Sequence, residues 1–185
     1  MKLIKRFTGF GMFLMVVSLS LSVLYPRQAA AQNNLDTMLN FGRRLAGLYF
    51  VTETTTGVQH LISLWADGNF QGISAEQEGG VPEFNPFSDQ VGTWKRTGRR
   101  EITAKVIDIT YNRDPMTLFG FGVVRYVLTF DDDFNAVTGR LEGGVIGPDG
   151  NPNDLDAEFL FTFDAPLQGE RVPIRFPRGF PSQSR

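Results

Sequence analysis

The sequence contains no cysteine and a single histidine, His60. Without cysteine the chain forms no disulfide bond, carries no lipid-modified N-terminal cysteine and offers no thiol nucleophile. A Gly-x-Ser-x-Gly motif is also missing, so a serine triad would have to recruit His60 to a serine that no motif singles out. These absences argue against nucleophilic catalysis, and they require a fold held by burial and backbone hydrogen bonds alone.

Long hydrophobic runs are also missing. The apolar run from about Met12 to Tyr25 is shorter than the roughly 20 residues of a membrane-spanning helix, and three serines interrupt it. Basic residues precede this run and Ala29-Ala30-Ala31 follows it, which is typical of a Sec-type signal peptide. We predict that residues 1–31 are removed after Ala31, with a retained membrane anchor as the alternative. Lys5-Arg6 lacks the paired arginines of a twin-Arg signal. The mature protein is then expected to be soluble and exported, either periplasmic or extracellular.

Positive charge is scarce in the predicted mature chain. Residues 1–31 contain four of the 18 basic residues and none of the 20 acidic ones, which leaves 14 basic and 20 acidic residues and a net charge of −6. This balance argues against nucleic acid as a partner. The remaining 154 residues are enough for one hydrophobic core, so we expect one domain.

From Gly47 onward, β-branched and aromatic runs alternate with Gly, Pro, Asn and Asp, a pattern typical of strands and turns. It predicts strands at residues 48–55, 58–66, 69–76, 91–97, 99–111, 122–130, 137–146 and 157–163. Asp67-Gly68 is expected to form a two-residue turn of the primed class. A bulge is expected within 99–111, because the apolar alternation Ile102, Ala104, Val106 changes to Ile107, Ile109, Tyr111.

Several strands have one apolar and one polar face. Residues 122–130 alternate cleanly, which places Tyr126 and Leu128 on the apolar face, and Phe159 and Phe161 share a face of the last strand. Eight such strands form a sandwich or a barrel, and only a closed barrel removes the unpaired edges. We therefore predict an all-β fold, an eight-stranded antiparallel up-and-down barrel. Its domains are a lead-in segment with a short helix (32–45), the barrel (46–166) and a Pro/Arg-rich tail (167–185).

Five segments carry a resemblance to a known family: Ala46-Gly47-Leu48-Tyr49, the Asp67-Gly68 hairpin, the stretch from Val91 to Ala104, Arg125–Phe130 and Thr138-Gly139. Over roughly residues 46–165 the chain resembles uncharacterised exported bacterial proteins. The resemblance implies a calycin-like barrel, related in architecture to lipocalins or to the allene oxide cyclase barrel. It implies no activity. Lipocalins have Gly-x-Trp at the first strand, where this chain has Tyr49.

An eight-stranded barrel has an interior that is either filled or large enough for one small ligand. His60 lies on the face of Val58, Ile62 and Leu64, so it is predicted to point inward as a structural or ligand-contacting residue. The predicted ligand-binding residues are His60, Ile62, Leu64, Tyr126, Leu128, Phe159 and Phe161. No catalytic residue, metal ligand or cofactor is predicted.

Several charged or aromatic groups have an ordinary structural explanation. The segment from Asp149 to Asp154 begins like a calcium loop but lacks glycine at the sixth position and glutamate at the twelfth, so turn chemistry explains it better. Asp131-Asp132-Asp133 is interpreted as a solvated hairpin tip. The basic residues around Gly98 (Lys95, Arg96, Arg99, Arg100) suit either an anionic ligand or a solvated turn. Trp65 and Trp94 suit core packing or a pocket wall.

An outer-membrane barrel needs an apolar outer band, and Lys105, Asp108, Arg125, Arg140 and Glu158 are expected on outward faces, which argues against stable membrane insertion. The leading hypothesis is a non-enzymatic binding module for a small apolar or amphipathic ligand. One alternative is a cyclase or isomerase of the allene-oxide-cyclase type, assisted by His60 or Glu142. The other is a structural or surface domain with a filled core.

Overall fold

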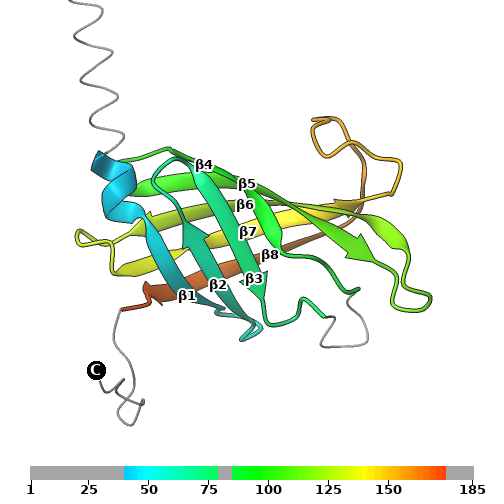
Figure 1. Cartoon of the computed structure of the whole chain (residues 1–185), viewed down its shortest axis with the longest axis horizontal. Helices are drawn as coiled ribbons and strands as arrows, with labels where there is room; N and C mark the ends of the chain where they lie inside the picture. Colours follow the sequence, from blue (N-terminus) through cyan, green and yellow to red (C-terminus); the bar gives the residue numbers. More distant parts are fainter. Residues whose placement is uncertain (1–39, 79–84, 174–185) are drawn as a thin grey trace, which may run out of the picture. The chain divides into compact units, whose positions relative to one another are not determined.

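The computed structural model describes residues 40–78 and 85–173. The described chain forms a short helix at residues 40–45 and eight strands (Figure 1). The strands are β1 Gly47–Glu53, β2 Gln59–Leu64, β3 Asn69–Ser74, β4 Gln90–Arg96, β5 Glu101–Tyr111, β6 Leu118–Phe130, β7 Ala136–Ile146 and β8 Phe159–Arg171. The predicted signal peptide and most of the predicted tail lie outside the described residues. No helix within the described ranges has the length and apolar character needed to cross a membrane.

Each strand pairs antiparallel with the next, and β1 pairs antiparallel with β8, so the sheet closes into a barrel. The closing pair runs from Tyr49 opposite Arg171 to Glu53 opposite Leu167. The predicted all-β, eight-stranded up-and-down barrel is therefore confirmed. Closure gives each of the eight strands a hydrogen-bonded neighbour on both sides along at least part of its length.

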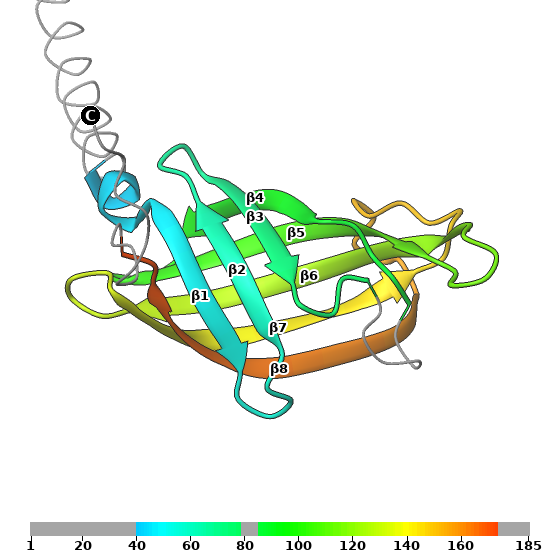
Figure 2. The same cartoon turned by 60° about the horizontal axis from the view of Figure 1, so that its bottom comes forward.

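The strands differ in length, and this shapes the two ends of the barrel. Strands β1 to β4 have six or seven residues each, whereas β5 to β8 have 11 to 13. The long strands continue past the short ones on the right of Figures 1 and 2. We call the end where β1 begins the packed end, and the end where β1 stops the open end.

The packed end is filled by aromatic and aliphatic side chains. The rings of Tyr49 and Phe130 meet edge to face with centroids 5.4 Å apart, and Phe134 lies 5.8 Å from Phe130. Leu45, at the end of the helix, is fully buried. Edge-to-face aromatic pairs of this kind stabilise a core beyond the area that they bury. The inward face of the strands is therefore a filled core at this end.

The β2–β3 hairpin differs from the predicted two-residue turn. Trp65 N–H donates to Asn69 O and Gly68 N–H donates to Trp65 O, which leaves three loop residues, 66–68. Gly68 has a φ of 96°, but Asp67 does not have a positive φ. The prediction of a primed turn was wrong, because a three-residue loop with a left-handed glycine is a second good solution for a short hairpin.

The bulge predicted within 99–111 was expected where the alternation changes, between Val106 and Ile107, and the strand is regular at that point. The pairing of β5 with β6 is regular from Glu101 to Thr110, and its register shifts only between Thr110 and Tyr111. The alternation that begins with Ile102 therefore continues inward through Asp108 and Thr110, each 4% exposed. Asp108, predicted to face outward, lies inside the barrel. The sequence reasoning assumed that an apolar residue must face the core, whereas strand geometry forces residues i and i+2 onto one face.

The last strand is longer than predicted. β8 continues eight residues past Phe163 to Arg171, so the predicted domain boundary at residue 166 falls inside it. Its register with β7 shifts between Val145 and Ile146: Val145 faces Phe161 but Ile146 faces Phe159. This irregularity moves Phe159 off the face of Phe161, because one extra residue reverses which side a side chain takes. The predicted shared face of Phe159 and Phe161 was therefore wrong.

Candidate functional site: a cavity at the open end of the barrel

A cavity of about 460 Å³ lies inside the barrel at its open end. It is bounded where β1, β3, β5 and β7 end and where β2, β4, β6 and β8 begin. The residues around it are Glu53, Thr56, Val58, His60, Ser74, Glu76, Asn85, Phe87, Gln90, Asp108, Thr110, Gly122, Val124, Tyr126, Leu141, Val145, Phe161, Phe163, Asp164 and Ala165. Its volume lies within the roughly 300–1,000 Å³ of small-molecule sites. We call this space the lumen cavity.

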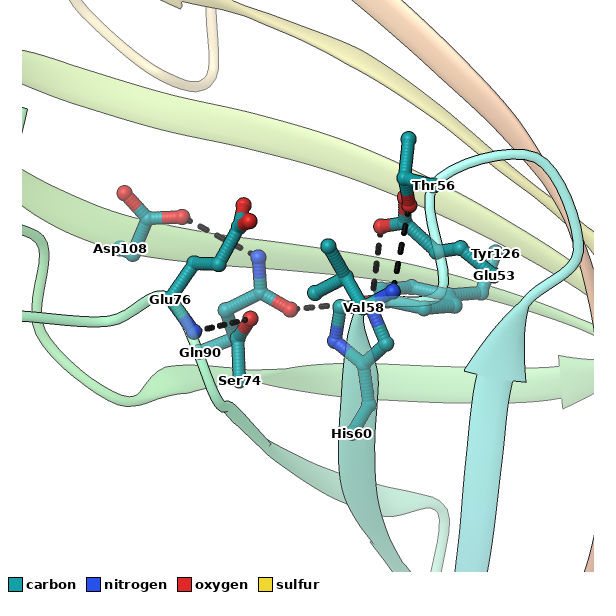
Figure 3. Close-up of polar contacts among 9 residues, drawn as sticks. All are labelled: Glu53, Thr56, Val58, His60, Ser74, Glu76, Gln90, Asp108 and Tyr126. Carbon is teal, nitrogen blue, oxygen red and sulfur yellow. Dashed lines mark hydrogen bonds and ion pairs between the residues drawn. The ribbon is translucent and has the colours of Figure 1, made fainter. Parts of the chain in front are cut away.

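One wall of the lumen cavity is polar and its groups form a hydrogen-bonded chain. The Tyr126 hydroxyl donates to Gln90 Oε1 at 2.6 Å, and Gln90 Nε2 donates to Asp108 Oδ2 at 3.3 Å (Figure 3). Thr110 Oγ1 donates to Asp108 Oδ1 at 3.1 Å. Burial raises the pKa of Tyr126, and the nearby carboxylates of Asp108 and Glu53 raise it further. Tyr126 is therefore a neutral donor that holds Gln90 in place.

Asp108 is the most enclosed carboxyl group of the cavity. Burial raises its pKa above the ordinary value, against the hydrogen bonds from Gln90, Thr110 and the Gly122 backbone, which favour the charged form. A Cβ at Gly122 would lie 2.4 Å from Asp108 Oδ1, so only glycine leaves room for this carboxyl group. The pairing of β5 with β6 thus both places Asp108 and makes space for it.

A second polar group lies between β1 and β2. His60 Nε2 is 3.0 Å from Glu53 Oε1, and Thr56 Oγ1 donates to Glu53 Oε2 (Figure 3). Burial alone raises the pKa of Glu53, but the hydrogen bonds from His60 and Thr56 and the charge of His60 outweigh it and hold the pKa below its usual value. Glu53 is therefore an ionised carboxylate that orients the imidazole of His60.

The opposite wall is apolar and belongs to the long strands. Val145 faces Phe161 and Gly143 faces Phe163 across the β7–β8 pair, and Leu141 faces Ala165 one step deeper. Phe161 and Phe163 remain 45% and 36% exposed although they line the cavity. Both residues belong to the part of β8 that extends beyond its pairing with β1, which covers Leu167–Arg171. The cavity is consequently open to solvent at its mouth.

The structure brings three of the predicted ligand-binding residues together in the lumen cavity: His60, Tyr126 and Phe161. Ile62, Leu64 and Leu128 point inward and are buried, but they lie deeper in the barrel and do not line the cavity. Phe159 lies outside the lumen and borders a groove on the outer wall, because of the register shift in β8. Six of the seven predicted residues therefore point into the barrel, and three of these six border the cavity. Whether any of them contacts a ligand remains a prediction.

Sequence reasoning missed the polar wall, namely Glu53, Gln90 and Asp108. A signal was present for two of them: Glu53 continues the inward alternation of Tyr49 and Val51, and Asp108 continues that of Ala104 and Val106. Inward polar residues at the end of an otherwise apolar series mark where a packed core gives way to a polar space.

A larger hollow of about 880 Å³ lies on the outer wall, between β4–β8 and the segment 147–158. Its charged groups neutralise one another: Arg125 and Arg140 form ion pairs with Glu142, and Arg140 also pairs with Asp164. Lys105 donates to Pro152 O at 2.7 Å. Glu142, named as a candidate for the isomerase alternative, therefore lies on the outer wall, away from the lumen cavity. The side chain of Asp164 belongs to this outer network too.

The acidic turns use their side chains for local hydrogen bonds. Asp131 Oδ1 accepts from Asn135 N–H at 2.7 Å, and Asn151 Oδ1 accepts from Asn153 N–H at 2.9 Å. Within the described ranges, no three His, Asp or Glu side chains gather into a potential metal site. Around Gly98, Arg96 donates to backbone oxygens and Arg100 pairs with Asp132. The basic residues named in the sequence analysis are absent from the lining of the lumen cavity.

The fold and the cavity define this protein as an antiparallel eight-stranded closed β-barrel with a solvent-connected lumen. No protein-family model, curated protein or solved structure matches the chain.

Proposed function

We propose that the protein is a non-enzymatic binding module that holds a small amphipathic molecule in the lumen cavity. The observation that supports it is that the 460 Å³ cavity has one polar wall and one apolar wall. Polar side chains of β1–β5 face Val145, Phe161 and Phe163 of β7 and β8. A few placed polar groups beside an apolar surface are typical of small-molecule sites.

The volume of the lumen cavity argues against the alternative of a structural domain with a filled core. A lumen smaller than about 300 Å³ would disfavour a small-molecule ligand, and this one is larger. We further propose that the barrel is calycin-like in descent and that the mature protein works after export, in the periplasm or outside the cell.

The isomerase alternative has one specific observation in its favour. His60, oriented by Glu53, and Asp108, whose pKa burial raises, line the same cavity and could act as a base and an acid. A substrate that isomerises in the presence of the protein, and no longer does so with His60→Gln, would support this candidate over the binding module.

Binding can be tested with N-phenyl-1-naphthylamine, an uncharged probe whose fluorescence rises in apolar surroundings. Phe161→Ala is expected to change its Kd by about fivefold or more, because Phe161 forms part of the apolar wall. Phe50→Ala is the matched control: Phe50 is 39% exposed, close to the 45% of Phe161, but faces the outside of β1. Absence of binding, or an equal response of the two variants, would overturn the proposal.

A further inference from the structure

Acidic side chains dominate the charged groups that line the lumen cavity. Glu53, Glu76 and Asp108 contribute carboxyl groups, and no Lys or Arg occurs among the described residues that line it. The imidazole of His60 is already engaged by Glu53. A ligand with a negative charge would therefore enter a space that offers carboxylates and no free cation. Burying a charge without a partner of opposite sign is costly.

The surroundings of Asp108 indicate which kind of ligand group would suit the cavity. Its three polar partners, Gln90 Nε2, Thr110 Oγ1 and the Gly122 backbone N–H, are all donors. Such a set suits an ionised carboxylate, which only accepts hydrogen bonds. Yet Asp108 is 4% exposed, and the described residues that line the cavity include no Lys or Arg to balance its charge. A positive charge on a ligand would complete this arrangement.

We propose that the ligand of the lumen cavity is a cationic amphiphile, an amine whose ammonium group lies beside Asp108 and whose apolar body packs on Phe161 and Phe163. This inference rests on the proposed function and adds the ligand class. Glu76, half-buried in the turn after β3, adds a further carboxylate to the lining of the cavity (Figure 3). Its charge attracts a cation on the way in and repels fatty acids and other anionic amphiphiles.

Three probes of equal chain length separate charge from apolar contact: decylamine, decanol and decanoate, titrated calorimetrically into the purified protein at pH 7 below their aggregation concentrations. Decylamine is expected to bind at least about tenfold more tightly than decanoate, with decanol between them. Asp108→Asn is expected to remove most of the difference in affinity between decylamine and decanol. The decanol Kd should stay within about twofold of its value for the unsubstituted protein. Glu76→Gln is a second variant, in case Asp108→Asn fails to fold.

The matched control is Glu170→Gln, which removes the same charge from an exposed position on the outer face of β8. Glu170→Gln should leave all three Kd values unchanged. If it weakened decylamine binding as much as Asp108→Asn does, decylamine would only be following the overall negative charge, and the inference would be overturned. Decanoate binding as tightly as decylamine would also overturn it while leaving the binding module intact. If none of the three probes binds, the proposed function fails as well.

Discussion

The guanidinium group of Arg171 lies over the ring of Tyr49, 5.2 Å from its centroid, and Nη2 donates to the Tyr49 hydroxyl at 2.7 Å. Arg171 is the last residue of β8 and Tyr49 lies near the start of β1, so this contact joins the two strands that close the barrel. Tyr49 in turn donates to Leu45 O. Arg171 also donates to Phe134 O and Ala46 O. One side chain thus satisfies carbonyl groups at the helix end and in the β6–β7 turn, and it also contacts the Tyr49 hydroxyl of the first strand.

Replacing Arg171 with methionine keeps an apolar side chain in place of the arginine stem and removes every one of these donors. We expect a loss of about 2–4 kcal/mol in the free energy of unfolding, because several partly buried carbonyl groups lose a charged donor. Denaturant unfolding followed by circular dichroism measures it. Arg125→Met is the control: its ion pair with Glu142 is on the outer wall, and exposed pairs of this kind contribute less than about 1 kcal/mol. Equal losses for both would refute the role given to Arg171.

The β2–β3 hairpin provides a test of its three-residue loop. Gly68 has a φ of 96°, where a Cβ is strained, so Gly68→Ala should lower the free energy of unfolding by about 1 kcal/mol or more. Gly147→Ala is the comparison, because Gly147 has no positive φ and a Cβ there would meet nothing within 4 Å. Thermal melts of the two variants should differ by several degrees. Indistinguishable melts would contradict the left-handed conformation of Gly68.

The strands and their closure were predictable because strict alternation leaves few arrangements that bury every apolar face. The lumen was harder to predict, because alternation says which way a side chain points and not how deep it lies. Ile62 and His60 share a face of β2, yet only His60 reaches the cavity. The depth of a residue follows from the pairing of strands and from their unequal lengths, which are tertiary properties. Phe159 shows a further limit, since nothing in the sequence of β8 marked the register shift beside it.

Asp108 leads to a prediction about pH. Because burial raises its pKa in the folded protein, the folded state binds more protons than the unfolded state between the ordinary pKa and the raised one. The contribution of Asp108 to stability therefore falls as pH rises through this window, by at most about 1.4 kcal/mol per pH unit. Below the ordinary value both states are protonated and the penalty is absent.

Asp108→Asn is expected to melt at a higher temperature than the natural protein at pH 7, and the two should converge near pH 3. Thermal melts across pH 3–8 measure the difference, with Glu170→Gln as a surface control for which no such convergence is expected. A constant difference across the range would contradict an elevated Asp108 pKa.

Phe161 distinguishes a lumen with open space from a filled one. Phe130 lies in the packed end and is 1% exposed. Phe130→Ala should lower the free energy of unfolding by about 3–5 kcal/mol, because it leaves a cavity among atoms that cannot close it. Phe161 already borders open space and is 45% exposed, so Phe161→Ala should lose well under half as much. Denaturant unfolding of both variants gives the two values on one scale. If Phe161→Ala costs as much as Phe130→Ala and neither the variant nor the natural protein binds N-phenyl-1-naphthylamine, the lumen is filled and the ligand proposal has to be abandoned.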